Sequence, residues 1–152
     1  AKSKDGRALS VLSAGVHGVY PHYETDPMLE KGNYSIKNAA DAAGVYNDVG
    51  MAKLAEKYPG VNFTHAAPGF VATSWGTEMP TVVRWLVRGL QVFGKSRGDC
   101  AQKLGDGWLK RGPGLSLMGE RGHEVSPTPK HQKVMSSGLW ADTCKRLERW
   151  LN

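Results

Sequence analysis

Three short stretches of the sequence could form one reaction site, and two of them carry polar side chains that could act in proton transfer. Ser13 ends an apolar run, Tyr34 is followed by Lys37, and the turn Pro68-Gly69 ends a second apolar run. A tyrosine can donate a proton, but its ordinary pKa of about 10 is too high for efficient acid–base catalysis at neutral pH. A lysine ammonium nearby favours the phenolate and lowers that pKa. A serine hydroxyl can hydrogen-bond an oxygen on which negative charge develops.

The order of these stretches resembles the carboxy-terminal half of the short-chain dehydrogenase/reductase family, over nearly all of residues 6–150. The run from Gly6 to Gly15 resembles the family's fifth strand, whose end carries a catalytic serine, and Ser13 falls on that position. Tyr34-Ser-Ile-Lys-Asn-Ala-Ala resembles the start of the next helix, where the family has Tyr-x-x-x-Lys followed by two small residues. Pro68-Gly-Phe-Val-Ala-Thr resembles the turn and downstream threonine beside the nicotinamide ring.

The resemblance implies an NAD(P)-dependent oxidoreductase acting on a carbonyl or a secondary alcohol. It makes Ser13 and Tyr34 the catalytic residues, with Lys37 as the cation beside the phenol. It also implies contacts with the nicotinamide end of the cofactor from Pro68, Gly69 and Thr73, and Asn38 can bond a ribose hydroxyl of the cofactor. No metal ion is expected.

Two features depart from the family pattern. The lysine lies three residues after Tyr34, and Asn38 takes the fourth position. At about 100° per residue, this shift moves the ammonium to a different flank of the helix, and Asn38 carries no charge to lower the pKa of the phenol. In addition, the sequence contains no Gly-x-x-x-Gly-x-Gly turn to hold a pyrophosphate. We therefore expect NAD or NADP to bind only with a nucleotide-binding half, and neither cofactor to bind the isolated chain.

The pattern of apolar residues predicts an α/β fold. Short apolar runs at residues 7–14, 61–67 and 114–119 predict buried parallel strands. Helical spacing predicts helices over residues 35–58, 81–93 and 133–151, with Ser96 as the N-cap of a further helix. We expect one unit over residues 1–152, a partial Rossmann-type parallel sheet of about three strands with helices on both faces.

The resemblance also implies a partner. In the family, the strand matching residues 7–13 pairs on one side with the strand matching residues 61–67, and on the other with a strand that precedes anything in this sequence. Ala8 to Leu12 contains neither charge nor proline to protect such an edge. We therefore expect a second polypeptide to complete the sheet beside residues 7–13, in a homo- or hetero-oligomer. The chain is then a fragment, one piece of a split protein, or a degenerate subunit, and the alternative function is a non-catalytic structural or interaction subunit.

Composition narrows the remaining classes of function. The net charge is +6, but the basic residues are scattered and form no stripe with aromatic residues, so we expect no nucleic-acid partner. No apolar run approaches the roughly 20 residues of a membrane span. The two cysteines, Cys100 and Cys144, lie far apart, which favours a reducing intracellular compartment, the cytoplasm or an organelle matrix.

Two local motifs have simpler explanations. Residues 89–96 match the Walker A pattern, but the intervening positions are bulky and a helix is predicted before them. His17, His22, Glu24 and Asp26 lie in a predicted loop without the spacing of a metal site. We expect neither nucleotide hydrolysis nor a metal centre from these residues.

Overall fold

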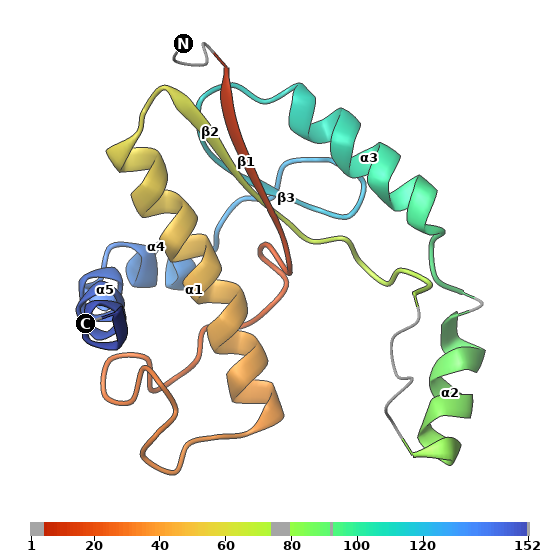
Figure 1. Ribbon diagram of the computed structural model, residues 1–152, viewed down its shortest axis with the longest axis horizontal. Helices are drawn as coiled ribbons and strands as arrows, with labels where there is room; N and C mark the ends of the chain where they lie inside the picture. Colours follow the sequence, from red (N-terminus) through yellow and green to blue (C-terminus); the bar gives the residue numbers. More distant parts are fainter. Residues whose placement is uncertain (1–4, 74–79, 92, 152) are drawn as a thin grey trace.

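The structure is a computed structural model that describes residues 5–73, 80–91 and 93–151. Strands and helices alternate along most of the chain (Figure 1). The elements are β1 (Gly6–Val11), α1 (Ile36–Lys57), β2 (Val61–Ala66), α2 (Thr81–Gln91), α3 (Arg97–Leu109), β3 (Gly114–Met118), α4 (Pro129–Met135) and α5 (Leu139–Leu151).

The three strands form one parallel sheet in the order β1-β2-β3. Gly6 is opposite Val61 in the first pair, and Asn62 is opposite Gly114 in the second. Helices cover both faces of the sheet, so the predicted partial Rossmann-type α/β fold is confirmed. No helix within the described ranges is long and apolar enough to cross a membrane.

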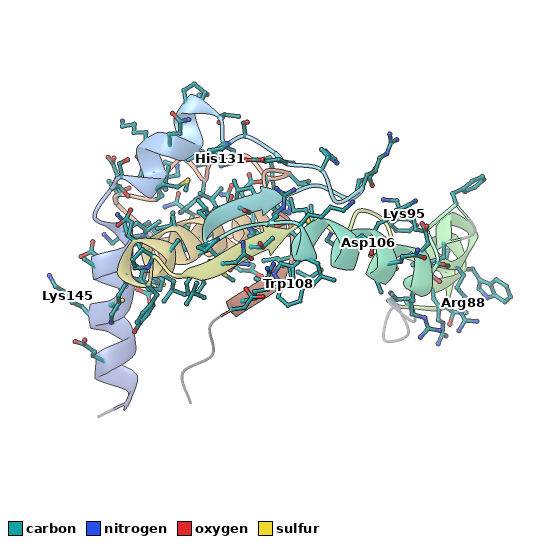
Figure 2. All side chains as sticks on the ribbon, turned by 90° about the horizontal axis from the view of Figure 1, so that it is seen from above. Arg88, Lys95, Asp106, Trp108, His131 and Lys145 are labelled. Atoms are coloured by element: carbon teal, nitrogen blue, oxygen red, sulfur yellow. The ribbon has the colours of Figure 1, made fainter. Side chains whose placement is uncertain are left out.

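The two faces of the sheet pack against different helices because strand side chains alternate. On one face, Ala66 and Met118 pack with Cys100 and Leu104 of α3. On the other face lies α1, whose outer side packs against α4 and α5 through Val45, Val49, Val134 and Leu139. In Figure 2, Lys145 of α5 and Arg88 of α2 lie at opposite ends of the molecule.

Helix α1 begins where local chemistry favours it. The Ser35 hydroxyl accepts a hydrogen bond from the Asn38 amide at 3.0 Å and caps the helix. Many of the buried positions of α1 carry small residues, among them Ala42, Gly44 and Ala52, which let neighbouring elements pack closely against the helix. Ser96 caps α3 in the same way, as its position in the sequence predicts.

The predicted single helix over residues 133–151 is wrong in one respect, because two helices occupy this part of the chain. Pro129, at the start of α4, follows the N-cap Thr128, and α4 ends at Met135 with Ser136 as its C-cap. The Ser137 hydroxyl then accepts a hydrogen bond from the Leu139 amide at 3.3 Å. Serine and glycine at residues 136–138 therefore cap two helices, although the apolar spacing continues across the break.

Candidate functional site

The carboxyl ends of the three parallel strands meet at one edge of the sheet, which is where α/β sheets commonly bind ligands. Ser13 follows β1, Pro68-Gly69 follows β2, and Glu120 follows β3. The structure therefore brings two of the three predicted stretches to the same edge. The third stretch, from Tyr34 to Asn38, lies at the start of α1.

Ser13 is held firmly by its backbone, whereas its hydroxyl has no partner. Its amide donates a hydrogen bond to Nε2 of His65 at 3.0 Å. Its Oγ is buried and makes no hydrogen bond. A Cβ built on Gly44 of α1 would lie 2.8 Å from this Oγ, so the hydroxyl packs against bare backbone. A buried, unpaired hydroxyl costs free energy, and such atoms are candidates for a ligand contact.

A buried histidine–carboxylate pair positions Ser13. Nδ1 of His65 lies 2.5 Å from Oδ1 of Asp48, and the two side chains are 0% and 1% exposed. Because Nε2 accepts the Ser13 amide proton, the ring proton is on Nδ1 and is donated to Asp48. The chain Asp48–His65–Ser13 thus joins α1, β2 and the end of β1 in one hydrogen-bonded unit.

A second histidine, His17, lies near the Ser13 hydroxyl. Cδ2 of His17 would be 2.9 Å from the same Cβ on Gly44, so the imidazole and Ser13 Oγ approach one position on α1. Nδ1 of His17 is 3.5 Å from Oδ1 of Asp41, whose other oxygen accepts a hydrogen bond from Lys37. The hydrogen bond from Lys37 holds the pKa of the Asp41 carboxyl below its ordinary value, against the opposing effect of burial.

The residues predicted around the phenol lie in a different setting. Tyr34 precedes the N-cap of α1, and its side chain is 71% exposed. Lys37 is paired with Asp41 across one turn, and the Asn38 side chain donates to the Asn33 carbonyl at 2.8 Å. From Ile36 to Gly44 the helix rises about 12 Å at 1.5 Å per residue, so Tyr34 lies well before the Ser13 contact along the axis.

The ion pair between Lys95 and Glu120 packs against the turn after β2. Gly69 has φ 69°, which favours glycine, and a Cβ there would overlap the Glu120 carboxylate. Nζ of Lys95 lies 2.7 Å from Oε2 of Glu120. The hydrogen bond from Lys95 keeps the pKa of Glu120 below its ordinary value. Thr73 is exposed at the end of this segment.

The Walker A match has a structural explanation. Gly89 lies within α2, Lys95 is paired with Glu120, and the Ser96 hydroxyl accepts from the Asp99 amide at 3.0 Å. In the predicted loop, the Asp26 carboxylate is engaged within the loop itself. It accepts hydrogen bonds from two loop amides and from Asn33. Within the described ranges, no three His, Cys, Asp or Glu side chains are grouped so that they could hold a metal ion.

Sequence analysis did not find the two acidic residues that organise this region. Asp41 and Asp48 are seven positions apart and therefore lie on one side of α1, and both are buried among small residues. The sequence signal that could have identified them is a pair of acidic residues seven positions apart within an alanine- and glycine-rich helix. Comparison with known proteins gives no matching family model, no matching curated protein and no matching solved structure.

Proposed function

We propose that this chain is the catalytic-side portion of an NAD(P)-dependent oxidoreductase that acts on a carbonyl or a secondary alcohol. The observation that carries the proposal is Ser13 Oγ, a buried hydroxyl without a partner at the carboxyl end of a parallel strand. Its place next to the Pro68-Gly69 turn supports the same reaction, because the residues expected at the substrate and at the nicotinamide end then share one edge.

Each residue of the site has a distinct part in this proposal. Ser13 donates a hydrogen bond to the substrate oxygen, where negative charge develops. Tyr34 supplies the proton to that oxygen and Lys37 favours the phenolate once the start of α1 is brought to Ser13 in the complete protein, because here Tyr34 is exposed and Lys37 is paired with Asp41. Pro68, Gly69 and Thr73 would hold the nicotinamide end of NAD or NADP, Asn38 would bond a ribose hydroxyl, and the cofactor supplies the hydride. His65 and Asp48 keep the Ser13 backbone in place.

A second polypeptide is part of the proposal. Val11 and Leu12 at the end of β1 are 51% and 48% exposed, and Tyr34 is also largely exposed. Within the part of the chain that is described, β1 has a neighbour on one side alone, β2. A partner strand beside residues 7–13 would cover the strand edge and would bring the nucleotide-binding half, as a subunit of a homo- or hetero-oligomer.

The compartment that we propose is the cytoplasm or an organelle matrix. Cys100 and Cys144 are both free thiols, and Cys100 is buried. Free thiols persist in a reducing environment.

The test is hydride transfer by the protein encoded by the complete coding sequence that contains these residues. NADH and NADPH deuterated at the transferable position are incubated with a panel of ketones and aldehydes, and the alcohols are analysed by mass spectrometry. Deuterium in an alcohol product supports the proposal. Titration calorimetry on the 152-residue chain should give no heat with either cofactor, because the pyrophosphate turn is not in this sequence.

The second candidate function is a non-catalytic structural or interaction subunit. The pairing of Lys37 with Asp41 favours it, because that ammonium is then engaged away from the phenol. Stable association with a partner without hydride transfer to any compound in the panel would select this second function.

A further inference from the structure

Helix α2 projects away from the body of the molecule. In Figure 1 it lies beyond the far end of α3, at a distance from the sheet and from α1. Its side chains Val82 and Trp85 are 77% and 70% exposed, and Phe93, just beyond its end, is 87% exposed. Large apolar side chains this exposed in one segment indicate a binding surface.

The same segment is strongly basic. Residues 80–98 contain four basic residues and no Asp or Glu: Arg84, Arg88, Lys95, whose ammonium is paired with Glu120, and Arg97. At about 100° per residue, Thr81, Arg84, Arg88 and Gln91 fall on one side of α2, and the helix is strongly amphipathic although its mean hydropathy is low. Figure 2 shows Arg88 at the outer end of the molecule.

We propose that α2 binds the surface of an anionic lipid bilayer and lies parallel to it. A large separation of apolar and basic sides, low overall hydropathy and exposed aromatic residues together are the pattern of helices that lie in the membrane interface. The helix has 11 residues, about 16 Å at 1.5 Å per residue, so it is too short to span a bilayer.

The side chains of α2 suit the two layers of such an interface. Trp85 and Val82 enter the boundary between headgroups and acyl chains, where the indole is especially favourable. Arg84 and Arg88 reach anionic headgroups while their aliphatic stems remain against apolar surface. A protein partner with an apolar groove would bury Val82 and Trp85 equally well, but the two arginines on the polar side, with no acidic residue in α2, favour an anionic lipid surface.

The test is co-sedimentation of the full 152-residue chain with vesicles of phosphatidylcholine alone or mixed with phosphatidylserine. The wild-type chain should bind the mixed vesicles more tightly, and added salt should weaken this binding. The double variant Arg84→Gln/Arg88→Gln should bind them roughly 30-fold more weakly, at about 1 kcal/mol per basic residue. Val82→Ser/Trp85→Ser should lose at least about tenfold.

Matched controls separate this surface from general charge and apolarity. Lys130→Gln/Lys133→Gln removes the same charge from exposed positions of α4, and Ile36→Ser removes an aliphatic side chain that is 84% exposed on α1. Both controls should bind as the wild type does, with thermal melting used to verify folding of every variant. The proposal is overturned if mixed vesicles do not bind the wild type, or if the α2 variants bind as the controls do.

A third outcome would identify a different occupant. If sedimentation velocity without lipid shows a dimer that Val82→Ser/Trp85→Ser dissociates, and vesicles bind no variant, α2 is an interface between two copies of the chain and the lipid proposal is wrong. Vesicle binding is measured without turnover. The lipid-binding proposal is therefore tested independently of the reaction proposed at Ser13.

Discussion

Nε2 of His65, at the centre of the sheet, accepts the backbone amide proton of Ser13 at 3.0 Å. This bond fixes the direction in which the chain leaves β1 and places the Ser13 hydroxyl against α1. Because the other ring nitrogen is bonded to Asp48, the serine is positioned from two elements that are far from it in sequence. The site thus depends on the packing of α1 onto the sheet.

Removing His65 should destabilise the chain strongly. His65→Leu leaves the Asp48 carboxylate buried without a partner, which typically costs about 3 kcal/mol or more of unfolding free energy. Urea unfolding measures this loss. The control is Glu56→Gln, at an exposed position of α1, the helix that carries Asp48, and it should change stability by less than about 0.5 kcal/mol. A loss below about 1 kcal/mol in His65→Leu would mean that Asp48 is solvated or re-paired.

The contact between Gly44 and Ser13 predicts opposite effects for two glycine substitutions. Gly44→Ala places a methyl group 2.8 Å from Ser13 Oγ and should destabilise the chain by about 1–3 kcal/mol. Gly105→Ala meets no atom within 4 Å in the interior of α3 and should stabilise the chain by about 0.5–1 kcal/mol. Equal effects in urea unfolding would contradict the close approach of α1 to Ser13.

Asp26 should make part of the stability depend on acid pH. Burial alone would raise the pKa of this carboxyl, but hydrogen bonds from Asn33, Lys31 and Glu30 outweigh burial and keep the pKa below its ordinary value. A carboxyl with a lowered pKa stabilises the folded state above its unfolded pKa of about 4, and this contribution is lost as pH falls through the folded pKa.

Asp26→Asn should therefore be less stable than the wild type at neutral pH, and the difference should shrink below about pH 4. Urea midpoints measured across this range give the comparison. Asp142→Asn, at an exposed position of α5, serves as the control with little change in pH dependence. A difference between Asp26→Asn and wild type that stays constant with pH would contradict the role assigned to the hydrogen bonds.

Sequence reasoning succeeded where the signal is local and failed where it depends on long-range packing. The apolar runs predicted the three strands, and Ser96 stands at the N-cap that its residue type favours. The break at residues 136–138 was missed because apolar spacing continues across it. The proximity of Ser13 and Gly44 depends on the path of residues 14–35, which no periodic pattern determines.

The free edge of β1 predicts a pattern of amide exchange. The Leu12 amide donates to the Ala66 carbonyl at 2.9 Å, and because strand amides alternate in direction, those of Leu9 and Val11 point away from β2. In the isolated chain, Leu9 and Val11 should exchange faster than Ser10 and Leu12, and a partner strand should slow them. Equal protection without a partner would mean that the edge is already covered.

The most direct test of the proposed reaction is the rate of hydride transfer in Ser13→Ala, made in the protein from the complete coding sequence. Losing one hydrogen-bond donor to the developing oxyanion should lower kcat about 100-fold or more, while cofactor binding is retained. Ser126→Ala, at an exposed loop position, is the matched control and should keep the wild-type rate. Tyr34→Phe should abolish turnover by removing the proton donor. Hydride transfer at the wild-type rate in Ser13→Ala would contradict the assignment of this edge of the sheet as the active site.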